Sequence, residues 1–187
     1  VGTAPGCAFE CGGVHVLMLP GPPHEMSTML RRHAEPYLRK LSQEVIVSRD
    51  IMTFGMGESS VEALLRDRMT HMVNPTLATY AKPFEVRLRA TAKAAAAEEA
   101  LAMLAPVEEM VREALGDIVY GVDVPGLAEA CHAQLLRRGM TLATAESCTG
   151  GLAAEKITAI PGASRVYRGG VVSYWTSVKG DVLQVPQ

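Results

Sequence analysis

The segment from residue 84 to residue 92, FEVRLRATA, alternates between apolar and polar side chains. Its apolar members Val86, Leu88 and Ala90 each have a charged or polar residue on either side. Successive side chains of a β-strand point to opposite faces, so the segment is expected to be a strand with one buried face. A sheet of such strands needs a covering layer on one side only, which favours an α+β sandwich.

The neighbouring segments predict the other elements of this sandwich. Strands are expected over residues 44–54 and 76–81, and helices within 55–69 and 93–116, which gives the order β-α-β-β-α. Pro106 is expected to kink or break the second helix. Four apolar side chains of the first helix are expected to share one face: Val61, Leu64, Leu65 and Met69.

The segments on either side of the sandwich predict two further units. Residues 1–41 open with a Gly/Pro loop, followed by an expected strand over 12–20, a Pro-Gly turn and a helix over 24–38. Residues 123–187 follow the sandwich at 42–122. Their elements are expected in the order helix, strand, loop, helix, strand, with Gly139 ending the first helix.

Composition excludes several classes of protein. Hydrophobic residues make up 48% of the 187 positions and charged residues 20%, values typical of a globular protein. No apolar run reaches the roughly 18 residues of a membrane span. The formal net charge of −2 argues against a general nucleic-acid or membrane binder.

The order β-α-β-β-α is also that of a KH-type RNA-binding module. Residues 45–123 carry eight Lys or Arg against twelve Asp or Glu, a net charge of −4, and phosphate binding needs the opposite sign. The loop Gly55-Met56-Gly57 is followed by Glu58 and lacks the basic residues of an RNA-binding G-x-x-G loop. The sandwich is therefore expected to be a spacer or dimerisation domain.

The cysteines and the chain ends give three further expectations. Four cysteines are too few for a disulfide scaffold, and Cys7 and Cys11 are not spaced as C-x-x-C, so a cytoplasmic protein without a metal site is expected. The chain opens at Val1 in a loop-like string, with no signal peptide. Residues 179–187 read as an interrupted helical turn, so the chain is expected to be a fragment at both ends.

The stretch TLATAESCTGGLAAEKITAI places reactive side chains between a strand and a helix. The free N–H groups and the positive dipole end of such a helix suit a phosphate or a developing oxyanion. Ser147 or Thr149 could equally serve only as a helix cap. The reactive loop consists of Glu146, Ser147, Cys148, Thr149, Gly150 and Gly151.

A serine nucleophile needs a base, and no histidine lies near the loop in sequence. The downstream segment SYWTSVKG supplies Tyr174, which can relay a proton, and Lys179, which can activate a hydroxyl. A core position for Tyr174 and a solvated helix position for Lys179 are the structural alternatives. Cys148 remains a rival nucleophile, because a helix N-terminus favours the thiolate.

These residues carry a specific resemblance. The motif AESCTGG, followed by PGAS and RGGVVSY, resembles the C-terminal domain of the CinA family, the nicotinamide-nucleotide amidases of bacteria. The resemblance implies hydrolysis of nicotinamide mononucleotide to nicotinate mononucleotide and ammonia, in pyridine nucleotide recycling and without a cofactor. It assigns Ser147 as the nucleophile, with Tyr174 and Lys179 as catalytic partners. The family often has Tyr-Ser/Thr-Asn where this chain has Tyr174-Trp175-Thr176.

The same resemblance implies a set of substrate-binding residues. Arg168 is expected to contact the nucleotide phosphate, because arginine pairs well with phosphate oxygens. The complete set is Glu146, Thr149, Gly150, Gly151, Arg168, Gly169 and Gly170.

The rest of the chain resembles the other parts of CinA. GTAPG and LPGPPHEM resemble the end of a molybdopterin-binding-like domain that the family links to ADP-ribose pyrophosphatase activity, for which a divalent metal is left open. FGMGESSVE, NPTLATYAK and EVRLRATA resemble the KH-like middle domain. The fold class is therefore α/β and α+β. The N-terminal ligand loops would contain Gly2, Thr3, Gly21, Pro22, Pro23 and Glu25.

Three functions stay open at this point. The first is an amidase whose parent protein is active and whose 187-residue fragment is inactive. The others are a metal-dependent ADP-ribose pyrophosphatase and a non-enzymatic ligand-binding or competence-associated protein. A small-molecule nucleotide is the expected partner, in a homo-oligomer without nucleic acid or membrane.

Overall fold

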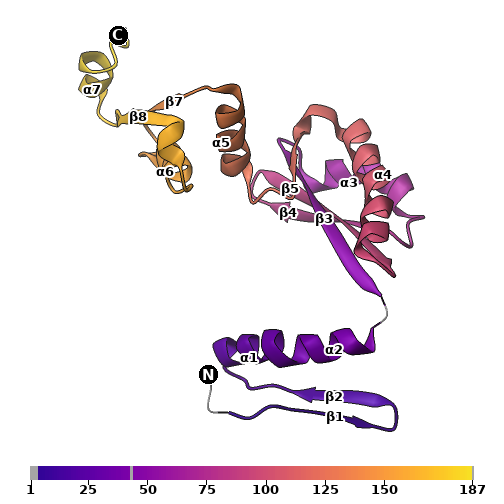
Figure 1. Ribbon diagram of the computed structural model, residues 1–187. Coiled ribbons are helices and arrows are strands. Elements are labelled where there is room, and N and C mark those ends of the chain that lie inside the picture. Colours follow the sequence, from indigo (N-terminus) through magenta and orange to yellow (C-terminus); the bar gives the residue numbers. More distant parts are fainter. Residues whose placement is uncertain (1–3, 43, 187) are drawn as a thin grey trace. The chain divides into compact units, whose positions relative to one another are not determined.

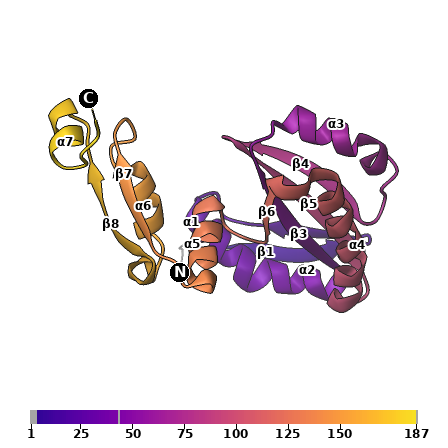
Figure 2. The ribbon, with the colours of Figure 1, turned by 90° about the horizontal axis from the view of Figure 1, so that it is seen from above.

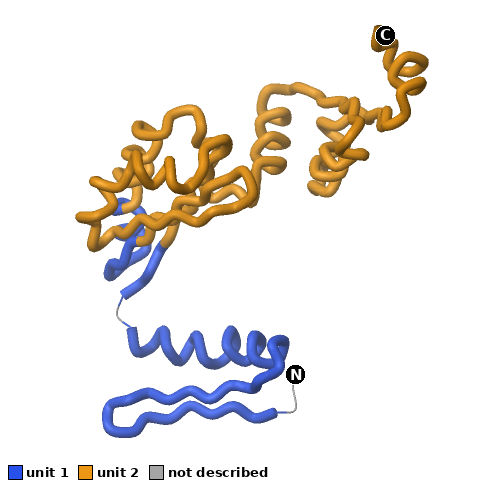
Figure 3. The backbone as a smooth tube through the Cα atoms, turned by 180° about the vertical axis from the view of Figure 1, so that it is seen from behind, with its two compact units in different colours: residues 1–47, 92–103 blue, residues 48–91, 104–187 orange. Residues whose placement is uncertain are grey.

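The computed structural model describes residues 4–42 and 44–186. The chain forms two compact units, one from residues 1–47 with 92–103 and one from residues 48–91 with 104–187 (Figure 3). Within the described residues, no helix has the length and apolar character needed to cross a bilayer.

The first unit begins with a β-hairpin. Strands β1 (Cys7–Cys11) and β2 (Val14–Met18) pair in an antiparallel register around Gly12 and Gly13, whose φ angles are 59° and 78°. A two-residue turn of this type needs positive φ at both positions, which glycine adopts freely. The expected loop is therefore wrong for residues 7–11, which form the first strand of the hairpin.

A continuous helical segment follows the hairpin and lies beside it (Figure 1). It consists of α1 (Pro23–Met29), a π-helical turn η1 (Leu30–Ala34) and α2 (Glu35–Leu41). His15 Nδ1 of β2 lies 2.8 Å from the Tyr37 hydroxyl of α2. This hydrogen bond ties the helix to the hairpin, and the predicted helix over 24–38 is confirmed.

The middle of the chain forms a four-stranded sheet with two long helices. Its order β4-β5-β3-β6 combines with the chain order β-α-β-β-α-β, which is the split βαβ arrangement of ferredoxin-like folds. Its elements are β3 (Val45–Phe54), α3 (Glu58–Met69), β4 (Thr76–Lys82), β5 (Glu85–Ala94), α4 (Ala97–Leu115), the 3-10 turn η2 (Gly116–Ile118) and β6 (Val119–Val122).

The sheet is antiparallel throughout. Strand β4 pairs with β5 and β3 pairs with β6 in antiparallel registers. Between β3 and β5, Ser48 Oγ lies 2.8 Å from Thr91 Oγ1, and Thr53 Oγ1 donates to the Val86 carbonyl at 3.0 Å. From the first contact to the second, the residue number rises along β3, from Ser48 to Thr53, and falls along β5, from Thr91 to Val86. The two strands are therefore antiparallel.

Two details of the predicted sandwich are wrong. Strand β6 was not predicted, and its four residues complete the second βαβ half. Helix α4 is a single helix that runs through Pro106, so the expected break is wrong, while a kink stays a prediction. It starts only at Ala97, because β5 extends to Ala94.

The alternation along β5 is confirmed. Val86, Leu88 and Ala90 are at most 1% exposed, and the residues between them are half-buried on the opposite face. Helices α3 and α4 supply much of the remaining core. Its other fully buried large side chains include Ile51, Met52, Val61, Leu65, Leu104 and Val111.

An ion pair on the other face of the sheet predicts a pH effect on stability. Arg89 donates to both carboxylate oxygens of Asp50, at 2.7 and 2.8 Å, and this hydrogen bonding is the main cause that lowers the pKa of Asp50. A lowered pKa means that the contact stabilises the fold above the unfolded pKa, near 3.9 for aspartate, and is lost as the pH falls through the folded pKa.

We expect Asp50→Asn to lower the free energy of unfolding by about 1 kcal/mol at pH 7, because the pair is partly exposed to water. The difference from wild type should approach zero near pH 2. Urea unfolding of both proteins at the two pH values measures it. An equal difference in the free energy of unfolding at both pH values would contradict the Asp50–Arg89 ion pair as its cause.

The C-terminal part contains a parallel strand pair, and Figure 2 shows β7 and β8 side by side with α6 next to them. Gly139 adopts a left-handed conformation at the end of α5, so its predicted role as helix stop is confirmed. The elements are α5 (Leu127–Arg138), β7 (Leu142–Glu146), α6 (Leu152–Thr158), the 3-10 turn η3 (Ala163–Arg165), β8 (Tyr167–Val172) and α7 (Thr176–Asp181).

Candidate functional site

The parallel pairing of β7 and β8 brings two chemically important segments to one edge. Glu146 at the end of β7 lies opposite Val172 at the end of β8. The residues that follow therefore leave the same edge of the strand pair: Ser147 after β7, and Ser173 and Tyr174 after β8. Ligands of α/β proteins bind at such carboxyl edges, so this edge is the candidate site.

The loop between β7 and α6 is shaped by two glycines. Gly150 and Gly151 have φ angles of 61° and 101°, a conformation that side chains with a Cβ rarely adopt. Gly150 N donates to the Ser147 carbonyl at 3.0 Å, which closes a tight turn around residues 147–150. Ser147 is half-buried within this turn, while Cys148 and Thr149 are exposed.

The start of α6 is already occupied by a carboxylate. Glu146 accepts hydrogen bonds from the backbone N–H groups of Ala153 at 2.9 Å and Ala154 at 2.8 Å. The expectation that these N–H groups are free for a phosphate or oxyanion is therefore wrong. The helix is capped by Glu146, and neither Ser147 nor Thr149 replaces it as the side-chain cap.

The environment of Glu146 favours its charged form. Its side chain is only 7% exposed, and the hydrogen bond from Ala153 is the main cause that lowers the pKa of this carboxyl. The positive dipole end of a helix also stabilises a negative charge at this position. In this arrangement both carboxylate oxygens face α6, and a substrate-binding role for Glu146 stays a prediction.

Ser173 joins the two segments of the site, and sequence reasoning missed it. Its N–H donates to the Glu146 carbonyl at 2.7 Å and its hydroxyl to the same oxygen at 3.1 Å. Ser173 is 4% exposed. A small polar residue directly before Tyr174 was the available signal, but its partner could be found only once the strand register was known.

The two proposed partners of the nucleophile lie beyond β8. Tyr174 is 74% exposed and follows the end of the strand, so its alternative as a core residue is wrong. Lys179 lies in α7 and is half-buried. Trp175, between them in sequence, is 77% exposed. Their roles in catalysis stay predictions.

The predicted phosphate ligand lies far along the strand from this edge. Arg168 is exposed near the amino end of β8, five residues before Ser173. At about 3.3 Å per residue, their backbones are separated by about 17 Å along the strand. Arg168 and Ser147 are therefore not brought together at one point, and a contact of Arg168 with the phosphate stays a prediction.

Backbone conformation and close packing account for the two glycines that follow Arg168. Gly169 has a φ angle of 138°. A Cβ on Gly170 would collide with Thr144 Oγ1 and the Tyr167 hydroxyl, which lie 2.8 Å from each other. Close packing explains glycine at position 170, and substrate binding by either glycine stays untested.

The structure describes only some of the residues predicted to form the N-terminal ligand loops. Gly2 and Thr3 lie outside the described residues. Gly21, Pro22 and Pro23 form an exposed turn, with Pro23 as the first residue of α1. Glu25 has a buried Oε2 atom without a hydrogen-bond partner.

Among residues 4–42 and 44–186, no three His, Cys, Asp or Glu side chains come together as metal ligands. A divalent metal in the N-terminal domain of the parent protein stays a prediction.

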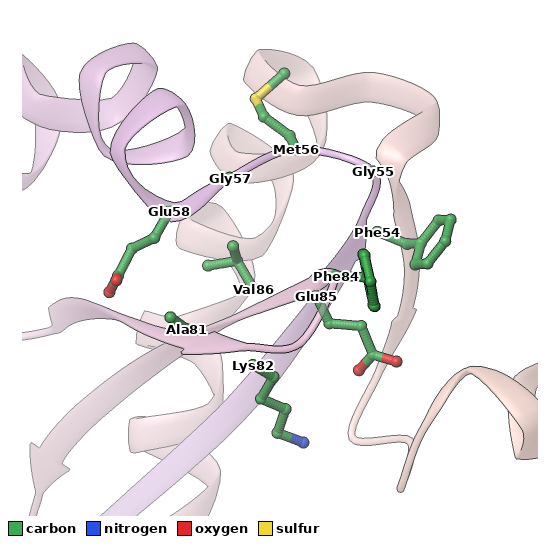
Figure 4. A pocket seen from close by; sticks show the side chains of 10 residues that line it. All are labelled: Phe54, Gly55, Met56, Gly57, Glu58, Ala81, Lys82, Phe84, Glu85 and Val86. Atoms are coloured by element: carbon green, nitrogen blue, oxygen red, sulfur yellow. The ribbon is translucent and has the colours of Figure 1, made fainter.

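A cavity of about 310 Å³ lies in the middle domain, between the β3–α3 loop and the β4–β5 turn (Figure 4). Phe54 and Phe84 lie at one end, and the Lys82 side chain points away from the loop. Glu58 and Glu85 are hydrogen-bonded to Thr79 and Tyr120. Its lining contains no candidate nucleophile and no residue of the β7–β8 edge.

The fold and the site define a mixed α/β protein. A ferredoxin-like domain precedes a parallel β-α-β unit that presents a serine loop at its carboxyl edge. Residues 48–121 match the damage-inducible protein CinA KH domain, and residues 125–187 match the CinA C-terminal domain. The chain belongs to the CinA family, and the predicted family and fold class are confirmed.

Curated relatives support this assignment over the whole chain. CinA-like proteins of Desulfovibrio desulfuricans and Dictyoglomus turgidum are 46% and 41% identical over 187 and 186 residues, 100% of this chain in each case. A CinA-like protein of Kosmotoga olearia is 44% identical over 178 residues, or 95% of the chain. The chain spans 44%, 45% and 43% of these relatives' lengths, respectively.

Proposed function

We propose that the protein carrying this chain hydrolyses the carboxamide of nicotinamide mononucleotide, with Ser147 as the nucleophile. The main support is that Ser147 and Tyr174 leave the same edge of a parallel strand pair. Ser173 holds this edge together through two hydrogen bonds to the Glu146 carbonyl. The match of residues 125–187 to the CinA C-terminal domain agrees with this reading.

The proposed reaction has two steps. The Ser147 Oγ attacks the carboxamide carbon, and Lys179 accepts the hydroxyl proton with Tyr174 as relay. The C–N bond then breaks, and the nitrogen takes up this proton and leaves as ammonia. Water hydrolyses the resulting ester, which releases nicotinate mononucleotide and restores the serine hydroxyl.

Trp175 allows binding to be tested separately from catalysis. It follows Tyr174 directly and is the one tryptophan of the 187 residues. Nicotinamide mononucleotide carries a pyridinium ring, and a cationic ring is attracted to the face of an indole. We expect saturable quenching of Trp175 fluorescence by this substrate, obtained as the difference between wild type and Trp175→Phe.

The control ligand is ribose 5-phosphate, which keeps the phosphate and lacks the ring. It should leave the Trp175 signal unchanged. Quenching that rises linearly with substrate, as for free N-acetyltryptophanamide, would show only random collisions and would contradict binding at this edge. The complete natural protein is the sample, because this chain spans under half of its relatives' length.

A further inference from the structure

We infer that Glu146 is a positioning residue, which holds the Ser147 loop and the Tyr174 segment in one arrangement through its carboxylate and its backbone carbonyl. The inference rests on the proposed amidase function. It differs from the predicted role of Glu146 as a substrate contact, because the side chain is directed at the protein itself.

The carboxylate fixes one end of the Ser147 loop. Each of its two oxygens accepts one backbone N–H, from Ala153 and Ala154, so the start of α6 is tied back to the end of β7. The five residues between, 147–151, form a loop that is closed at both ends. With Glu146 only 7% exposed, this closure is protected from water.

The carbonyl of the same residue fixes the second segment. Ser173 donates to it from both its N–H and its hydroxyl, at 2.7 and 3.1 Å. Ser147 is the next residue after Glu146, and Tyr174 is the next after Ser173. The nucleophile and its proposed relay are thus each one residue away from a shared hydrogen-bonded junction.

The position of the carboxylate also bears on how the substrate phosphate binds. A helix N-terminus is a common phosphate site, but here the Glu146 carboxylate occupies the N–H groups of Ala153 and Ala154. A phosphate at this point would meet a negative charge. The start of α6 is therefore disfavoured as the site of the substrate phosphate, and its contacts with Glu146 serve the geometry of the loop.

Kinetics of Glu146→Gln in the complete natural protein test the inference. Glutamine keeps the size of the side chain but replaces one acceptor oxygen by an NH₂ group that would face a backbone N–H. A displacement of about 1 Å in a catalytic group can cost about a hundredfold in rate. We expect kcat to fall by about 10- to 100-fold with KM changed by less than about twofold.

Two further variants make the result specific. Glu155→Gln removes the same charge from an exposed position of the same helix and should keep the wild-type kcat. Glu146→Asp keeps both acceptor oxygens and should recover part of the rate. An unchanged kcat in Glu146→Gln would overturn the inference, and so would a raised KM with normal kcat, which would indicate a substrate contact.

Hydrogen exchange decides the question independently of activity. Positioning predicts that Glu146→Gln accelerates amide exchange in both segments, at Ala153–Ala154 and at Ser173. Faster exchange at Ala153–Ala154 alone would show that Glu146 only caps α6, and this result would overturn the inference. If the wild type releases no ammonia, the amidase proposal fails, and the exchange experiment still tests whether Glu146 couples the two segments.

Discussion

Replacing Ser147 by alanine lowers ammonia release from nicotinamide mononucleotide by roughly three to six orders of magnitude, the range expected when a serine nucleophile is removed. The reason is chemical: alanine has no oxygen to form the ester intermediate, so water must attack the amide directly. Steady-state ammonia release by the complete natural protein and its Ser147→Ala variant measures the loss.

The neighbouring thiol provides the matched control. Cys148 is exposed and lies in the same tight turn, so Cys148→Ala changes one side chain of the loop and leaves the hydroxyl in place. We expect it to keep the rate within about threefold, a difference below 1 kcal/mol. A large loss in Cys148→Ala with a normal rate in Ser147→Ala would assign the nucleophile to the thiol.

Two adjacent leucines of α3 should differ sharply in their effect on stability. Leu65 is 0% exposed and Leu64 is 54% exposed. Leu65→Ala leaves a cavity in the core of the ferredoxin-like domain and should lower the free energy of unfolding by about 2–5 kcal/mol. Leu64→Ala removes the same atoms from a site in water and should change it by less than about 0.5 kcal/mol.

Urea unfolding followed by circular dichroism measures both variants under the same conditions. Because the substitution is identical and the positions are adjacent, helix propensity affects both equally. Similar losses in the two variants would contradict the assigned face of α3.

The same helix shows what the sequence could predict. Val61 and Leu65 are four residues apart, share a face and are buried, as expected. Leu64 is also apolar, but its place three residues after Val61 lies at the border of that face. Its exposure depends on how far the sheet extends beneath the helix, which is a tertiary property.

The alternation along β5 was predictable for a related reason. Only one face of the sheet is buried, so buried apolar residues alternate with polar residues along the strand. Strand β6 has four residues, all half-buried, and therefore shows no comparable alternation. Its pairing with β3 is decided by the fold and not by local sequence.

The continuous α4 also depends on tertiary contacts. Pro106 is exposed, so the carbonyl of Ala102 that loses its hydrogen bond lies on the exposed side of the helix. The buried side chains of Leu104 and Val107 hold the two halves in the core. Local propensity alone therefore overestimates the effect of this proline.

At the candidate site, the sequence located the loop but not its internal contacts. The glycines and the serine marked a turn between a strand and a helix, and the structure has that turn. The capping of α6 by Glu146 joins residues seven and eight positions apart, beyond the usual capping distance. The bond from Ser173 to Glu146 needs the parallel register, which no local pattern contains.

Trapping the covalent intermediate tests most directly whether Ser147 is the nucleophile. The complete natural protein is mixed with nicotinamide mononucleotide, quenched in acid during turnover and digested with trypsin, and the peptide 139–156 is sequenced by mass spectrometry. We expect an acyl group, derived from the substrate by loss of ammonia, on Ser147. An adduct on Cys148, or ammonia release without any adduct on this peptide, would contradict Ser147 as the nucleophile.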